Sequence, residues 1–303
     1  MTRLQRRLLA WYARAGRARL PWRTARDPYY TLVSESMLQQ TQVDRVVPVF
    51  TAFIARFPTL ASLAAAGTAD VLRMWKGLGY NSRAVRLQAA ARTVVETHGG
   101  HMPRSTDALR ALPGIGPYTA AAIRAFAFDL DDAPIDTNVR RIVHRMFYGA
   151  EYPPRASAQV LAARALEIVP AGMAHDWNSA LMDLGATICG ARAPKCGQCP
   201  VAGVCAAAPI DANRLERERR EHAKPMPPAR AIRFESTARY ARGRIVDRLR
   251  ELAAGERISL LDLHRDVQPL VPSRSIDDIA ALVCALGRDG VLALYEDGVS
   301  LRE

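Results

Sequence analysis

The sequence predicts a mainly α-helical protein that ends in a small module of mixed helix and strand. Apolar residues recur three and four positions apart through residues 1–205, as at Leu60, Leu63 and Ala64, and this spacing is typical of amphipathic helices. Interruptions such as Asp27-Pro28 are typical of helix ends. Because residues 1–205 show no sustained strand alternation, we expect an all-helical domain there.

The last third of the chain divides at two changes in pattern. Residues 206–235 are predicted to form a linker that could include a short helix, since a densely charged run is followed by the proline-rich segment Lys224–Pro228, which cannot continue a helix. Residues 236–303 regain helical periodicity and end in two short apolar runs separated by an Asp-Gly turn, which predicts a hairpin. The expected helical stretches are Arg244–Ala253, Ile258–Val267 and Ile276–Leu286. Three helices and a hairpin predict a winged-helix-like module, whose role could be DNA contact or simple packing.

The composition is strongly basic. The chain has 303 residues, with 42 lysines and arginines against 30 aspartates and glutamates, for a formal net charge of +12. This balance favours a polyanionic partner, although an arginine-rich protein from a GC-rich genome would look the same. No apolar run approaches the roughly 18 residues of a membrane span, and residues 1–12 lack a signal-peptide core. We expect a cytoplasmic monomer with no membrane partner.

Four of the five cysteines share one short stretch with the spacing Cys-x6-Cys-x2-Cys-x5-Cys. They are Cys189, Cys196, Cys199 and Cys205. Four thiolates can hold a tetrahedral zinc ion or a [4Fe–4S] cluster, whereas disulfides are not expected in a cytosolic protein. Zinc ribbons usually pair two Cys-x2-Cys knuckles, and this run has one. The fifth, Cys284, lies in an apolar helical stretch and is expected to be buried.

A glycine turn and an aspartate form a second pattern. Gly114 and Gly116 allow a tight turn between two helices, whose backbone N–H groups and following helix N-terminus can bind phosphate. A lone Gly-x-Gly is common in helix hairpins. About twenty residues later, Asp136 enters a helix, where an aspartate is ordinarily an N-cap.

In this order, the turn, the aspartate and the cysteine loop resemble the helix-hairpin-helix DNA glycosylase superfamily over residues 8–205. The resemblance implies a two-lobed helical fold, a [4Fe–4S] cluster on the four cysteines, and a double-stranded DNA partner with a mispaired or damaged base that is flipped out. It makes Asp136 the essential carboxylate, which stabilises or bonds the oxocarbenium ion, and Asn138 a residue that orients the same centre. The implied DNA-contacting residues are Gly114, Gly116, Thr119, Arg192 and Lys195.

The segments Ser34–Val43 and Trp75–Tyr80 are similar to the MutY-type adenine glycosylases, although the first would also suit an ordinary amphipathic helix. This likeness implies that Glu35 protonates adenine at N7, as a general acid with a raised pKa. It also implies that Gln40 fills the duplex after base extrusion and that Tyr80 inserts beside an opposing 8-oxoguanine.

Three further positions bear on which base is removed. Leu20–Arg23 resembles a family strip that lines the adenine pocket, so Trp22 and Arg23 are expected there, although Trp22 could equally be a core residue. Asp183 stands where relatives often have glutamate, and its shorter side chain could alter the pocket. Tyr118 stands where lyase-competent relatives carry lysine; because tyrosine cannot form a Schiff base, we expect a monofunctional enzyme.

The chain also departs from the family pattern. Its tail is too short for the nucleotide-hydrolase-like domain that helps typical members recognise 8-oxoguanine, which weakens the expectation of a strong preference for that base over guanine. A thymine or uracil mismatch glycosylase acting opposite guanine would share Tyr118, Asp136 and the cluster. A noncatalytic DNA-binding factor is the other alternative; Glu35 together with Asp136 argues against it.

Overall fold

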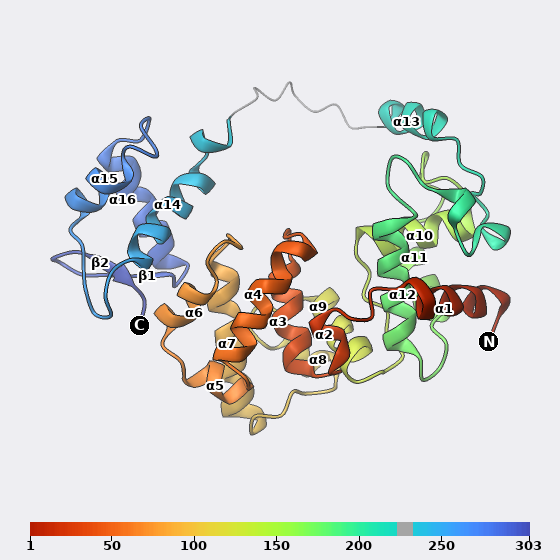
Figure 1. The fold of residues 1–303 in the computed structure, drawn as a ribbon, viewed down its shortest axis with the longest axis horizontal. Helices are drawn as coiled ribbons and strands as arrows, with labels where there is room; N and C mark the ends of the chain where they lie inside the picture. Colours follow the sequence, from red (N-terminus) through yellow and green to blue (C-terminus); the bar gives the residue numbers. More distant parts are fainter. Residues whose placement is uncertain (223–232) are drawn as a thin grey trace. The chain divides into compact units, whose positions relative to one another are not determined.

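The computed structural model describes residues 1–222 and 233–303, and helices dominate its ribbon (Figure 1). By internal contacts the chain forms two compact units. Unit 1 consists of Met1–Glu35, Met102–Ala111 and Ile115–Pro225, and unit 2 of Ser36–His101, Leu112–Gly114 and Met226–Glu303. The domain boundaries predicted from the sequence, at residues 205 and 235, are not tested by these two units and stay a prediction.

Unit 1 is built around one buried helix, α12, which packs against α1, α10 and a π-helical turn. Its core includes Leu8, Val139, Ile142, Trp177 and Leu181, all at most 1% exposed. The helices of unit 1 are α1 (Arg3–Ala15), α2 (Pro21–Thr24), α3 (Pro28–Leu38, which ends in unit 2), α8 (Thr106–Arg110), α9 (Pro117–Ala122), the π-helical turn (Ile123–Ala127), α10 (Thr137–Tyr148), α11 (Ala158–Glu167), α12 (Ala174–Thr187), two 3-10 turns (Cys196–Gln198 and Ala202–Val204) and α13 (Ala212–Glu221).

Unit 2 combines a helical layer with the C-terminal module. In the layer α7 packs on α5 and α6, and Phe53 stacks edge-on against Phe57 and Trp75. Its elements are α4 (Val43–Arg56), α5 (Leu60–Ala65), α6 (Thr68–Met74), α7 (Ser82–His98), a 3-10 turn (Phe234–Ser236), α14 (Ala238–Arg250), α15 (Leu260–Val267), α16 (Ile276–Arg288), β1 (Leu292–Leu294) and β2 (Val299–Leu301).

The predicted winged-helix-like module is confirmed in its elements. Strands β1 and β2 pair antiparallel, with Leu292 opposite Leu301, and a single bridge joins Ile258 to Val299. The module packs against the helical layer of its own unit, because α14 and β2 both contact α6. Arg250 donates to the backbone carbonyl of Leu72 at 3.0 Å. Packing is therefore one role of the module.

Two sequence expectations need comment. The prediction that Cys284 is buried was wrong: its side chain is exposed, because α16 turns Ile279, Val283 and Leu286 inward instead. The predicted linker contains helix α13, while its proline-rich segment Lys224–Pro228 lies outside the described residues. Within the described part of the chain, no helix has both the length and the apolar character needed to cross a bilayer.

Candidate active site

The centre of the candidate site is the buried carboxyl group of Glu35, on α3 in unit 1. Its side chain is 9% exposed and shares a hydrogen bond with Tyr118 at the start of α9. Burial is the main reason that the pKa of Glu35 is raised to about 7; the Tyr118 hydrogen bond and the charge of Arg23 lower it, and the charge of Asp136 raises it. Glu35 can therefore hold a proton near neutral pH, as a general acid must.

Tyr118 stays a neutral hydrogen-bond donor beside that carboxyl group. Its burial and the nearby charges of Glu35 and Asp136 raise its pKa well above the usual range. The structure thus brings Glu35 together with Tyr118 and Asp136, which follow it by 83 and 101 positions in the sequence, and the charges of these groups affect one another.

Asp136 is held in place by two hydrogen bonds of 2.7 Å. One carboxylate oxygen accepts from the backbone N–H of Val139, so Asp136 is the N-cap of α10, and the other accepts from the side-chain amide of Asn138. Asn138 in turn accepts from Arg141, which also donates to the backbone carbonyl of Cys189. Asp136 is therefore the N-cap of α10 and also accepts a hydrogen bond from Asn138, and hydrogen bonds connect it to the cysteine loop. The orienting role of Asn138 in the reaction stays a prediction.

A second carboxylate, Asp183 on α12, is 1% exposed and fixes two arginines. Arg17 and Arg23 form ion pairs with its two oxygens, at 2.7 and 2.9 Å. Burial alone would raise the pKa of Asp183, but the hydrogen bonds and charges of Arg23 and Arg17 outweigh it and hold that pKa below the usual range. Since both oxygens are engaged, we expect Asp183 to act on the pocket through Arg23, whose charge reaches Glu35. Trp22, beside Arg23 on α2, is 7% exposed.

Two predicted DNA-contacting residues in unit 2, Gln40 and Tyr80, share an unusual backbone conformation. Gln40 has φ of +57° and Tyr80 has φ of +46°, which residues other than glycine seldom adopt and which is often found at functional positions. Both side chains are exposed. Such strain persists only where the surrounding structure enforces it.

The enforcing residue is Arg83 on α7, which sequence reasoning missed. It is 7% exposed and makes six hydrogen bonds, to the C-terminal end of α3 and to the segments that flank Gln40 and precede Tyr80. Burial lowers its pKa to about 10. Its acceptors are the carbonyl oxygens of Ser36, Met37, Gln39, Leu78 and Gly79 and the hydroxyl of Thr41.

Replacing Arg83 with methionine is therefore expected to destabilise unit 2 strongly. Several buried carbonyl groups would lose their donor, and we expect a loss of roughly 3 kcal/mol or more in the free energy of unfolding. Chemical denaturation measures it, with Arg86→Met as a matched control, because Arg86 is exposed on the same helix. A loss below about 1 kcal/mol, as for an ordinary surface change, would show that Arg83 does not hold the loops.

The predicted phosphate-binding turn has the expected local geometry. Gly114 has φ of +77°, and a Cβ atom there would lie 2.9 Å from the Cβ of Arg86, so glycine is required. Gly116 is the N-cap of α9, and Thr119 is 5% exposed in its first turn. Phosphate contact at this turn stays a prediction.

The four predicted cysteine ligands line one cavity, together with Arg145. Burial is the main reason that the pKa of Cys199 is raised to about 11; the other three cysteines also raise it, and a backbone hydrogen bond lowers it. A bound cation would favour the thiolate form of this residue. Within the described ranges, no three His, Cys, Asp or Glu side chains are arranged to hold a single metal ion. Four cysteine thiols are the ligand set of either a tetrahedral zinc ion or a [4Fe–4S] cluster, and the four residues that line this cavity fit both groups.

Arg145 on α10 anchors this cysteine loop and was also missed. It is fully buried, forms an ion pair with Glu151 at 2.6 Å, and donates to the backbone of Gly190 and Ala191 and to the Cys189 sulfur. By contrast, Arg192 and Lys195 on the loop are exposed, as a role in contacting DNA requires.

Known proteins resemble this chain in sequence and in fold. Residues 33–166 match the HhH-GPD superfamily of base excision DNA repair proteins. The adenine DNA glycosylase of Mycolicibacterium smegmatis is 39% identical over 293 residues, which cover 96% of this chain and 93% of that protein. The structure of a thermostable thymine-DNA glycosylase matches with a TM-score of 0.61 and 32% identity, over 66% of this chain and 92% of that one. The structure of a non-covalent endonuclease III–DNA complex matches over 72% of this chain and 100% of that chain, with 20% identity and a TM-score of 0.57. The two proteins therefore share the fold.

Proposed function

Because this chain belongs to the HhH-GPD superfamily of base excision DNA repair proteins and, within it, to the adenine DNA glycosylases, we propose that it removes adenine mispaired with 8-oxoguanine or guanine. The observation that carries this proposal is the coupled pair of carboxyl groups in unit 1. Glu35 is buried with a pKa near 7, and Asp136, beside it, has its oxygens fixed by two hydrogen bonds. This arrangement suits one group to give a proton and the other to carry negative charge.

The proposed reaction uses each group once. The target adenine is flipped out of the duplex, and the Glu35 carboxyl group donates its proton to N7 of the base, which makes neutral adenine the leaving group. As the N-glycosidic bond breaks, its electrons leave with the base and positive charge builds on the sugar, where the Asp136 carboxylate stabilises it. Water then adds to the sugar and gives its proton to the Glu35 carboxylate, which restores the acid and leaves an abasic site.

We propose that the enzyme is monofunctional. Strand cleavage through a Schiff base needs an amine nucleophile, and Tyr118 occupies the place beside Glu35 and Asp136 where that amine would stand. We also propose that the enzyme acts on duplex DNA as a cytoplasmic, nucleoid-associated monomer, and that Arg192 and Lys195 contact the DNA backbone.

For the cofactor we propose a [4Fe–4S] cluster held by Cys189, Cys196, Cys199 and Cys205. The four cysteines line one cavity and each is partly buried, which supports it. Such a cluster would cross-link a loop that otherwise contains only two 3-10 turns. Arg145 would neutralise part of the thiolate charge through its N–H group on the Cys189 sulfur.

A second candidate function is thymine or uracil excision opposite guanine, which the likeness to a thymine-DNA glycosylase structure favours. The protonated Glu35 argues for adenine, because N7 of adenine is a basic site that accepts a proton, whereas a pyrimidine offers no N7. Excision assays distinguish the two.

The test is single-turnover excision by the holoprotein on duplexes with adenine opposite 8-oxoguanine, adenine opposite guanine, thymine opposite guanine and uracil opposite guanine. Each product is analysed with and without alkali. We expect cleavage only at adenine and only after alkali. Cleavage at thymine or uracil would overturn the adenine assignment, and cleavage without alkali would overturn the monofunctional one.

A further inference from the structure

Helix α1 carries a row of positive charge that the proposed chemistry does not use. Arg3, Arg7 and Arg14 are all exposed on this helix. Because an α-helix turns about 100° per residue, the three side chains leave it within about 40° of one another. At 1.5 Å per residue, the row is roughly 16 Å long. We call these three arginines the basic stripe.

No carboxylate offsets the charge of the basic stripe. Residues 1–26 contain eight arginines and no aspartate or glutamate. Three of the eight, Arg17, Arg23 and Arg26, form ion pairs with aspartates from later parts of unit 1. The arginines of the basic stripe form no ion pair with any residue that the structure describes. Uncompensated guanidinium groups on one face favour an anionic ligand.

The charge of the basic stripe is also unfavourable for α1 itself. Arg3 is the first residue of the helix, at the positive end of the helix dipole, where a carboxylate would be stabilising. Arg7 lies one turn further along the same face, and like charges four positions apart repel. Departures from local preference of this kind are expected at functional sites. The basic stripe therefore points to a function outside the folding of α1.

The opposite face of α1 fixes the helix within unit 1. Leu8 and Tyr12, which are 0% and 6% exposed, belong to the core of the unit, and α1 packs along α12 (Figure 1). The side-chain amide of Gln5 donates to the carbonyl of Ile168 at 3.1 Å, and a capping box between Thr2 and Gln5 closes the first turn. The basic stripe is therefore a fixed surface.

This surface borders the cysteine loop. A Cβ atom at Gly203, in the second 3-10 turn of that loop, would lie 3.1 Å from Nη1 of Arg7. The same loop carries the exposed residues Arg192 and Lys195, which are proposed above to contact the DNA backbone. The basic stripe thus adjoins a part of unit 1 that already has a proposed anionic partner.

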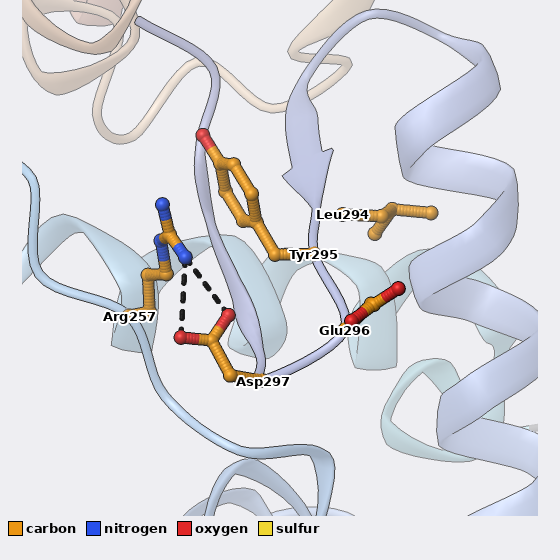
Figure 2. A pocket seen from close by; sticks show the side chains of 5 residues that line it. All are labelled: Arg257, Leu294, Tyr295, Glu296 and Asp297. Carbon is orange, nitrogen blue, oxygen red and sulfur yellow. Dashed lines mark hydrogen bonds and ion pairs between the residues drawn. The ribbon is translucent and has the colours of Figure 1, made fainter.

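Compensated arginines elsewhere in the chain provide the contrast. Three arginines of α13, in the same unit, form ion pairs with glutamates of their own helix: Arg214, Arg219 and Arg220. Figure 2 shows another in the C-terminal module, where Arg257 donates to the Asp297 carboxylate at 2.9 and 3.1 Å and stacks on the Tyr295 ring. Since these charges are already neutralised, we assign them no ligand.

We propose that the basic stripe is a further DNA-contacting surface, at which Arg3, Arg7 and Arg14 bind backbone phosphates that flank the excised base. This inference rests on the proposed function, because the adenine to be removed lies in duplex DNA. Phosphates follow one another every 3.4 Å or so along the axis of one strand, so a stripe of roughly 16 Å spans four or five of them. Backbone contacts of this kind position the duplex and read no sequence.

The test is the salt dependence of equilibrium binding by the holoprotein to a fully paired duplex, which needs no excision. The stripe variant combines Arg3→Gln, Arg7→Gln and Arg14→Gln, because glutamine removes the charge and is a good helix former. Each lost phosphate contact lowers the slope of log K against log salt by about 0.9. We expect the slope to fall by about 2 to 3 and binding in 0.1 M salt to weaken by roughly 60- to 500-fold.

A matched control removes the same three charges from α13, by Arg214→Gln, Arg219→Gln and Arg220→Gln. Its slope should change by less than about 0.5, because these arginines are paired within the helix. A second pair of variants repeats the comparison with a single charge. Arg7→Gln should lower the slope by about 1, and Arg257→Gln should leave it unchanged.

Two results would overturn the inference. An unchanged slope in the stripe variant would show that the arginines are only solvated or meet an acidic protein, and an equal loss in the α13 variant would show an effect of net charge alone. Thermal unfolding excludes misfolding, since relieving the repulsion on α1 should leave the stripe variant at least as stable as the unmutated protein. Adenine excision is measured separately, so its failure would overturn the proposed function and leave the slope as the test of this surface.

Discussion

Replacing Asp136 with asparagine is expected to lower the single-turnover rate of adenine excision by at least about 10³-fold while DNA binding persists. Asparagine has the same shape and is an equally good N-cap, so it can still accept the N–H of Val139 and start α10. It loses the negative charge that faces the developing positive charge on the sugar, and its amide nitrogen cannot accept the Asn138 hydrogen bond that an Asp136 oxygen accepts. The effect should therefore appear in the chemical step alone.

The measurement pairs single-turnover excision with binding to an uncleavable duplex, and Asp107→Asn is the matched control. Asp107 is an exposed aspartate in the first turn of α8, in the same unit, and its neutralisation should leave both quantities within about twofold. If Asp136→Asn kept a tenth or more of the rate, Asp136 would be only a helix cap. If the unmutated protein bound the duplex but excised no base, the noncatalytic alternative would stand.

Local sequence signals predicted the parts of this fold that depend on neighbours in the chain. The Asp-Gly turn between two apolar runs placed the hairpin of β1 and β2, and Asp136 was expected at a helix start, where it caps α10. The helical periodicity of the sequence predicted where α16 lies but not which of its faces is buried. The buried face of α16 passes through Val283, one position before Cys284, and a shift of one position turns a side chain about 100° around a helix.

The residues that sequence reasoning missed act over long distances in the chain. Arg83 donates to carbonyl oxygens at the end of α3 and in the loop after it, more than forty positions earlier. Arg145 reaches a loop that lies about as far ahead. Arginines of this kind carry no local pattern, and an arginine-rich chain offers many equivalent candidates. The Arg17–Asp183 pair likewise joins positions 166 apart. Only the folded structure distinguishes Arg83, Arg145 and the partly buried Arg17 from the solvated majority of arginines.

The acid role of Glu35 leads to a linked prediction about activity and stability. In the unmutated enzyme the excision rate requires the protonated carboxyl group, so the rate should fall about tenfold per pH unit above the Glu35 pKa of about 7. Glu35→Gln keeps the size of the side chain and an acceptor for the Tyr118 hydroxyl but has no proton to give. We expect its rate to be lower by about 10² to 10⁴-fold and to lack this fall.

The same substitution is expected to stabilise the fold at alkaline pH. The pKa of Glu35 rises from 4.5 to about 7 on folding, so the folded state binds the proton more tightly, and its stability falls as pH rises through that interval and stays low above it. Glutamine never ionises, so Glu35→Gln should gain up to about 3 kcal/mol in unfolding free energy at pH 8.5 and almost nothing at pH 4. Urea denaturation across this range measures the gain, and Glu167→Gln, an exposed change on α11, should show none. Burial raises the pKa of Glu35, and this one effect both makes the ionised carboxylate costly and lets the acid keep a proton to donate at neutral pH. A Glu35→Gln variant that lost activity without gaining stability would therefore mean that burial does not hold Glu35 protonated.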